Sequence, residues 1–315
     1  MAVKKRIKFN VDKLKECYRQ PVGFFEALSQ YPNNKYLEYD GFKLHIIDNG
    51  RYENSDKPPI RIKANVLLDD GTLVGDFVFH ASAQYDGRCF FTFANAALYE
   101  QTNLVRGEKY NHQSDIEYIS SVLGLELNNF TEIELAADVN FNIIAKIQRF
   151  IKDYEDFDMI LNGKRVSDEN RKLEGVGEYY GRSRAKRDKY PTLYFKQAHS
   201  DGLQLKIYDK TKEIIEENQT KKYIEEWNDF GSAHIYRIEL TIRNEQYKKW
   251  LDAIRSGEVG VLREWGDFDA SEGLLMLGAY KCPLWDFNAS KVLYFRHRAT
   301  SEVVSLLDIA LGAWG

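Results

Sequence analysis

The sequence predicts an α+β protein in which curved antiparallel sheets are flanked by helices. Tyrosine and phenylalanine are abundant, with 20 and 18 residues, and only 6 prolines interrupt the chain, a composition that favours strands. Stretches of alternating apolar positions are followed twice by helical patterns. This order is expected for antiparallel sheets with segregated helices, and it allows for an internal duplication.

The N-terminal part of the chain predicts a helix, a set of hairpins and a second helix. Apolar residues recur near helical spacing over residues 11–30, although Pro21 interrupts the pattern. Over residues 36–98, apolar and polar positions alternate between turn signals that end in glycine, which predicts antiparallel hairpins. The pattern Ser114-x-x-Glu117 ahead of an apolar run predicts the start of a short helix.

The rest of the chain alternates between strand and helix patterns around an irregular basic segment at residues 163–191. The predicted strands are residues 131–141, 192–196, 203–208 and 234–243. The predicted helices are residues 143–155, 210–227, 244–256 and 299–313. With 315 residues, the chain is long enough for one large domain or two modest ones.

Cysteine usage and hydropathy predict a cytoplasmic protein without a membrane partner. The three cysteines are far apart and lack metal-ligand spacing, as expected for reduced thiols. No apolar run follows the basic N-terminus, so no signal peptide is expected, and no segment reaches the length of a membrane span. The sequence contains neither a P-loop pattern nor a His-x-His pair, which argues against a nucleotide-driven motor or a histidine-ligated nickase.

The net charge of −4 is distributed unevenly. Residues 164–213 contain 13 lysine and arginine residues against 8 acidic ones, a net charge of +5, so the remainder of the chain carries a net charge of −9. A basic segment on an acidic body suits an enzyme that holds DNA in one place and uses carboxylates elsewhere. A solvated charged loop is the alternative interpretation.

Acidic side chains follow two of the predicted strands. Glu132, Glu134 and Asp138 share one face of the first strand, and Glu239 lies beside Arg237 on a second. Carboxylates that converge repel one another unless a divalent cation compensates them, and oxygen ligands of this kind suit Mg²⁺ or Mn²⁺. A polar, solvent-facing sheet surface is the alternative.

Three short motifs occur in a fixed order: Thr192-x-Tyr194, then Lys206-Ile207-Tyr208-Asp209-Lys210-x-x-Glu213, then Tyr236-Arg237-Ile238-Glu239. Their order and spacing resemble the Rep_trans family over about residues 130–245. That family comprises rolling-circle replication initiators of small plasmids and filamentous phages, with related relaxases of conjugative elements. Two features depart from the family pattern. Lys196-Gln197-Ala198 replaces Gly-Ser-Arg, and the first acidic strand lacks its usual arginine.

The resemblance implies a tyrosine-type DNA nickase and strand transferase that initiates replication through a covalent 5′-phosphotyrosine intermediate. Tyr194 is the expected nucleophile, with Tyr208 as a rival. The other expected site residues fall into three groups. The cationic partners are Lys206, Lys210 and Arg237; the Mg²⁺ or Mn²⁺ ligands are Glu134, Asp138 and Glu239; the DNA-binding residues are Tyr180, Arg182, Arg184, Lys186, Arg187 and Lys189.

The expected partners are double-stranded origin DNA and single-stranded DNA, with a host helicase and a second copy of the chain as further candidates. The predicted organisation is an N-terminal helix with hairpins at residues 1–110, a nicking core at 111–260 and an extension at 261–315, in one compact body. A conjugative relaxase with the same chemistry, or a non-catalytic origin-binding protein on the same fold, remains an alternative. The departures at Lys196-Gln197-Ala198 keep the second alternative open.

Overall fold

The computed structural model describes residues 6–51, 59–81, 87–102, 112–153, 155–169, 192–196, 203–231, 233–256 and 283–312. The chain divides into two compact units. The first comprises Met1–Val11 and Glu134–Gly315, and the second comprises Asp12–Ile133. Both divisions fall inside strands, namely β1 (Ile7–Arg19) and β7 (Glu126–Val139), so these two strands contribute residues to both units.

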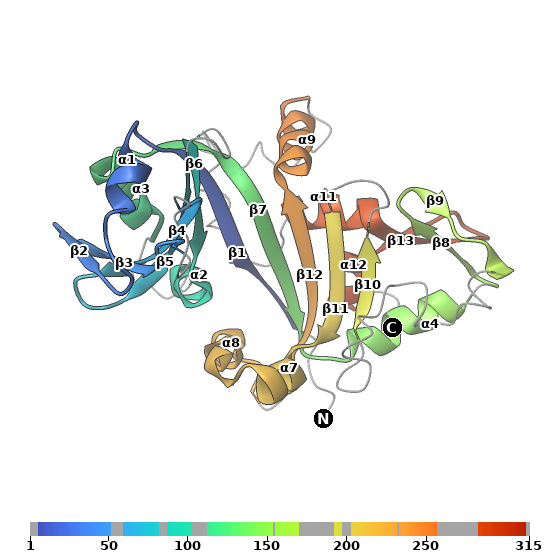
Figure 1. Cartoon of the computed structure of the whole chain (residues 1–315). Helices are drawn as coiled ribbons and strands as arrows, with labels where there is room; N and C mark the ends of the chain where they lie inside the picture. Colours follow the sequence, from blue (N-terminus) through green and yellow to red (C-terminus); the bar gives the residue numbers. More distant parts are fainter. Residues whose placement is uncertain are drawn as a thin grey trace. The chain divides into compact units, whose positions relative to one another are not determined.

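The predicted α+β class with antiparallel sheets is confirmed. Ten strands follow the order β10-β11-β12-β7-β1-β6-β5-β4-β3-β2, and a second sheet has the order β14-β13-β8-β9. Figure 1 shows helices lying beside these strands in each unit. None of the helices in the described ranges has the length and apolar character needed to span a membrane.

The first unit contains strands from the C-terminal half of the chain, the whole small sheet and most of the helices in the described ranges. Its strands besides β1 and β7 are β8 (Phe157–Leu161), β9 (Lys164–Arg165), β10 (Leu193–Lys196), β11 (Leu203–Asp209), β12 (Tyr236–Arg243), β13 (Leu293–His297) and β14 (Val303–Ser305). Its helices are α4 (Ile143–Lys152), α7 (Lys210–Glu217), the 3₁₀ turn η4 (Gln219–Lys221), α8 (Tyr223–Asn228), α9 (Asn244–Arg255), α11 (Pro283–Val292) and α12 (Leu306–Leu311).

One face of β11 and β12 forms the apolar core of the first unit. Leu205 and Ile207 of β11 alternate with polar residues, and both are fully buried. Helix α11 packs against both strands, and its Trp285 is fully buried with its ring 5.6 Å from that of Phe9. Because successive side chains of a strand point to opposite faces, the polar residues of β11 and β12 gather on the other face. That face carries the candidate site.

The second unit is an antiparallel meander with helices. Its strands besides β1 and β7 are β2 (Tyr36–Tyr39), β3 (Phe42–Asp48), β4 (Arg61–Leu68), β5 (Leu73–His80) and β6 (Arg88–Phe93), and its helices are α1 (Phe24–Leu28), α2 (Asn95–Thr102) and α3 (His112–Val122). The predicted hairpins are therefore confirmed. Gly71, in the turn between β4 and β5, has φ +88°, a backbone conformation that residues with a Cβ rarely adopt.

Three of the predicted helices differ from the structure. Residues 11–30 form most of β1 and the short α1 in place of one helix, because both faces of β1 are buried and its apolar residues therefore do not alternate. The helix expected at 210–227 is interrupted at Asn218, which separates α7 from η4 and α8. The expected helix 299–313 begins only at Leu306, because residues 303–305 form β14 and the side chain of Ser305, the last residue of that strand, caps α12.

Candidate active site

A row of three functional side chains crosses β10, β11 and β12. Tyr194 is opposite Lys206 in the β10–β11 pair, and Lys206 is opposite Glu239 in the β11–β12 pair. Residues directly opposite in antiparallel strands project to the same face of the sheet. The strand register therefore brings together the predicted nucleophile, one predicted cation and one predicted metal ligand.

Glu239 is the centre of a hydrogen-bond network on this face. Its Oε1 accepts a hydrogen bond from Nζ of Lys206 at 2.6 Å, and its Oε2 accepts one from the hydroxyl of Tyr208 at 2.7 Å. Glu239 is only 4% exposed, and a buried carboxylate is costly unless charged or polar donors compensate it. Lys206 and Tyr208 supply those donors and hold the carboxylate in one orientation.

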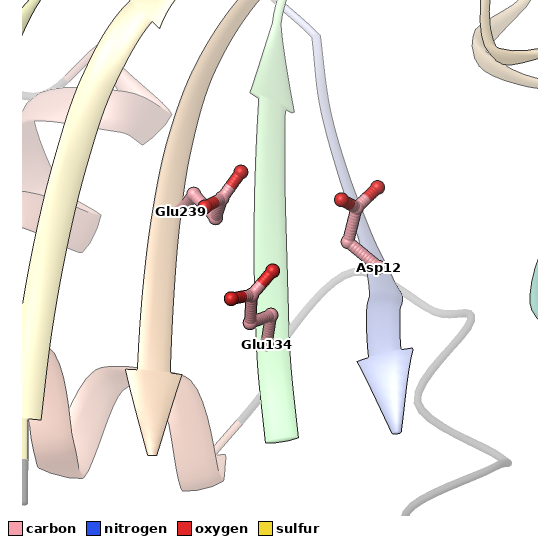
Figure 2. A group of neighbouring side chains, drawn as sticks. All are labelled: Asp12, Glu134 and Glu239. Atoms are coloured by element: carbon pink, nitrogen blue, oxygen red, sulfur yellow. The ribbon is translucent and has the colours of Figure 1, made fainter. Parts of the chain in front are cut away.

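Glu134 of β7 lies near Glu239, and the two belong to a group of carboxylates that includes Asp12 of β1. One oxygen from each of the three lies within 4.8 Å of the others. Figure 2 shows the three side chains on their strands, with their carboxylates directed to the same side. Clustered carboxylates of this kind fit the coordination preferences of Mg²⁺ or Mn²⁺.

Asp12 was not among the predicted site residues. A helix was expected over residues 11–30, and a helix does not place Asp12 in a sheet. In the strand that forms instead, Asp12 and Val11 point to opposite faces. The sequence offered little signal, because charged and apolar residues are mixed around Asp12. Oδ1 of Asp12 also accepts a hydrogen bond of 2.9 Å from the hydroxyl of Tyr99, within the second unit.

The electrostatics of Tyr194 and Lys206 are coupled. Burial raises the pKa of Tyr194; Lys206 opposes this shift, and the carboxylates of Glu239 and Glu134 add to it. Burial lowers the pKa of Lys206, but Glu239, which is both charged and hydrogen-bonded to it, together with Glu134 and Tyr194, leaves that pKa above its ordinary value. At neutral pH the site therefore contains a neutral phenol beside a charged ammonium group.

Asp138 and Arg237 form a separate buried pair. Nε and Nη2 of Arg237 donate to the two carboxylate oxygens of Asp138, each at 2.7 Å, and Asn228 of α8 donates to Asp138 at 2.8 Å. Asp138 is four residues from Glu134, which corresponds to about 13 Å along a strand. The structure thus brings together two of the predicted metal ligands, Glu134 and Glu239, and places Asp138 with Arg237 instead.

Lys210 occupies the first turn of α7, beyond the end of β11. It is 1% exposed, and its Nζ lies 2.5 Å from Oε2 of Glu213 and 5.6 Å from the ring centre of Tyr208. Lys210 therefore lies next to Glu213 and the ring of Tyr208. Lys206, by contrast, lies between Tyr194 and Glu239 in the strand register. The predicted DNA-binding residues, Tyr180, Arg182, Arg184, Lys186, Arg187 and Lys189, lie outside the described residues.

Comparison with known proteins indicates which kind of protein this segment resembles. Residues 160–259 match the family model Phage_CRI, which describes the N-terminal part of a phage replication-associated protein. This segment resembles replication-associated proteins. It contains Tyr194, Lys206, Tyr208 and Glu239, so the match covers the whole row described above. This match agrees with the resemblance to replication initiators that the order of the motifs predicts.

One solved structure and the curated proteins complete the comparison. A rolling circle replication initiator protein from Geobacillus stearothermophilus aligns with 91% of this chain and 97% of its own, at 14% sequence identity and a TM-score of 0.34. A comparison with curated proteins gives no match.

Proposed function

We propose that this protein initiates rolling-circle replication by nicking and rejoining one strand of origin DNA, with Tyr194 as the nucleophile and a divalent metal ion as cofactor. The observation that carries the proposal is the row Tyr194–Lys206–Glu239, which aligns a phenol, an ammonium group and a carboxylate on one sheet face. The match to a replication-associated family over the segment that contains this row supports the same assignment.

The proposed reaction is a transesterification. The phenol oxygen of Tyr194 attacks the scissile phosphorus, and a Tyr–O–P bond forms as the bond from phosphorus to the 3′ oxygen breaks. The phenol proton leaves to solvent, and the departing 3′ oxygen gains a proton. The product is a 5′-phosphotyrosine with a free 3′-OH, and attack of a 3′-OH on that linkage reverses the step and rejoins the strand.

Lys206 has two tasks in this reaction. Its ammonium group remains charged because its pKa is raised, and it opposes the rise in the pKa of Tyr194 that burial causes. The same charge stabilises the negative charge that accumulates on the phosphate oxygens in the transition state. Glu239 fixes the position of this charge through the 2.6 Å hydrogen bond.

Glu134 and Glu239 would hold Mg²⁺ or Mn²⁺, with Asp12 as the third carboxylate of the group. The bound ion would supply positive charge that polarises the scissile phosphate. The donor set fits such an ion because carboxylate oxygens retain free lone pairs when they also accept hydrogen bonds. Both oxygens of Glu239 already accept one hydrogen bond each, which keeps the carboxylate oriented.

The direct test is capture of the covalent intermediate. Supercoiled DNA from the replicon that encodes the protein is incubated with the protein and Mg²⁺ or Mn²⁺. One portion is analysed intact on a gel, and a second portion is digested with protease and nuclease for mass spectrometry. We expect nicked circles with protein on the 5′ end, and mass spectrometry should locate the nucleotide on Tyr194. Specific binding without nicking would support the non-catalytic alternative, and an adduct on Tyr208 would assign the nucleophile to that residue.

A further inference from the structure

The two faces of the sheet in the second unit differ in chemistry. One face is apolar and buried, with Leu44, Ile62, Phe77 and Phe91 each fully buried. The ring of Phe24 in α1 contacts Phe79, which belongs to this buried face. The alternate residues of the same strands point to the opposite face, which we call the outer face. Their burial is intermediate or they are exposed over most of β3 to β6.

A row of basic groups crosses the outer face. Arg19 of β1 is opposite Arg88 of β6, and Arg61 of β4 is opposite His80 of β5. The strands follow the order β1-β6-β5-β4, so these four residues, here called the cationic row, lie on consecutive strands. Burial and the nearby charges of Lys15 and Arg61 lower the pKa of His80, so the three arginines supply the positive charge of the row. Neighbouring strands are about 4.8 Å apart, and the row therefore extends for about 14 Å across the sheet.

The cationic row has little internal charge compensation. Like charges directly opposite in neighbouring strands destabilise a sheet, and Arg19 and Arg88 form such a pair. No salt bridge of either residue occurs within the described ranges. Arg61 approaches Asp48 at 3.8 Å, but both side chains are about half exposed, so the pair compensates little charge. Such a row is complementary to a polyanion.

Aromatic rings lie beside the cationic row. Phe90 is on β6, two residues from Arg88, and is partly exposed. Nζ of Lys15 lies 4.9 Å from the centre of the Phe90 ring, and the ring of His80 lies edge-on to it at 5.7 Å. The ring of Phe90 is thus held in place by its neighbours. A ring fixed next to cations on a strand is the arrangement with which sheet-based domains stack and retain unpaired bases.

We propose that the outer face of the second unit binds single-stranded DNA, with the cationic row contacting phosphates and Phe90 stacking on a base. The proposal rests on the proposed function in taking DNA as the partner, and it adds a binding surface made of residues that take no part in the proposed nicking reaction. Duplex DNA hides the faces of its bases, whereas a partly exposed ring on a sheet can contact only bases that are unpaired. An initiator that nicks one strand generates such DNA.

The test is equilibrium binding of the full-length protein to a fluorescent oligothymidylate, with chelator present so that no cleavage occurs. Arg19→Gln combined with Arg88→Gln should weaken binding and reduce the slope of log affinity against log salt by about 0.7 for each phosphate that the variant no longer neutralises. The matched control is Arg149→Gln combined with Arg296→Gln, which removes two exposed arginines from the first unit and should leave the slope unchanged.

Phe90→Leu tests stacking separately. It should weaken oligothymidylate binding by about 5- to 100-fold with little effect on the salt dependence. Tyr118→Leu, which removes an exposed ring from α3, is its control and should bind like the wild type. If Phe90→Leu does not fold, as judged by circular dichroism, the arginine variants decide the question.

Three outcomes would overturn the proposal: an unchanged salt slope in the Arg19 and Arg88 variant, equal losses in the control, or a larger loss for duplex than for single-stranded DNA. Loss of nicking in the wild-type protein would instead refute the proposed function and leave the binding result standing.

Discussion

Arg237 and Asp138 form a two-point ion pair in the interior of the first unit, with both hydrogen bonds at 2.7 Å and side chains that are 0% and 1% exposed. The sequence placed Asp138 among the metal ligands and Arg237 among the cations that act on the phosphate. The pair instead connects β7 to β12, and Asn228 joins α8 to it. We therefore assign both residues to the support of the sheet on which Glu239 and Glu134 lie.

Asp138→Ala should destabilise the protein, because it leaves the guanidinium of Arg237 buried without its partner. Breaking a buried pair from one side typically costs about 3–5 kcal/mol. Urea denaturation should show a loss of this order. Glu132→Ala on the same strand is the comparison. Its partner Lys13 is 36% exposed, and an accessible pair of this kind contributes less than about 1 kcal/mol. A fully stable Asp138→Ala protein that had lost metal binding would return Asp138 to the metal site.

Glu134→Gln should reduce affinity for Mn²⁺ without destabilising the fold. The substitution removes one anionic oxygen from the carboxylate group and relieves repulsion between Glu134 and Glu239. We expect a loss of metal affinity beyond the roughly 10- to 100-fold that follows removal of an outer-shell partner. Titration calorimetry or the Mn²⁺ electron paramagnetic resonance signal would measure it. Glu38→Gln, at an exposed pair with Lys43, should bind the metal normally; equal affinities in the two variants would contradict the site.

Lys206→Gln should lower the rate of covalent adduct formation by about 10²–10³-fold, the usual cost of removing one electrostatic stabiliser of a transition state. Oligonucleotide affinity should change much less, because the interaction strengthens as charge develops on the phosphate. Lys222→Gln, an exposed lysine ahead of α8, is the control with the same change of charge. A loss confined to affinity would show that Lys206 only binds DNA.

The pH dependence of the rate of adduct formation, compared between the wild type and the Lys206→Gln variant, tests whether Lys206 acts on Tyr194. Burial raises the pKa of Tyr194, so its reactive phenolate is scarce at neutral pH, and the rate of adduct formation should rise with pH. Lys206 lowers the pKa of Tyr194, so its removal should shift this rising limb to higher pH. In the wild type, Lys206 itself remains charged across the profile because its pKa is raised. Identical pH profiles would show that Lys206 does not act on Tyr194.

The sequence predicted part of the candidate site, namely the row of Tyr194, Lys206 and Glu239, but neither the place of Asp12 nor the pairing of Asp138. Alternation and motif order identified Tyr194, Lys206 and Glu239 because an antiparallel register turns regular spacing into proximity. Asp138 was predicted beside Glu134 because the two share one face of a strand, but sharing a face says nothing about the distance along the strand, and the structure pairs Asp138 with Arg237. Asp12 was missed because a strand buried on both faces lacks the alternation by which a strand is recognised.

The final prediction separates the two tyrosines of the site. Tyr194→Phe removes the attacking oxygen and little volume, so the protein should fold and bind DNA but form no covalent adduct. Tyr208→Phe removes the donor to Oε2 of Glu239, in a side chain that is 7% exposed. Leaving that buried acceptor short of a partner should cost about 1–3 kcal/mol of stability, while adduct formation persists.

Both variants are compared by thermal denaturation and by adduct formation on a labelled oligonucleotide in Mg²⁺. A stable but inactive Tyr194→Phe protein beside a less stable, active Tyr208→Phe protein is the expected pattern. The reverse pattern would make Tyr208 the nucleophile and Tyr194 its neighbour. Since Glu239 orients Lys206 as well as Tyr208, a Tyr208→Phe protein that is both inactive and stable would indicate that the hydroxyl positions Glu239 for catalysis.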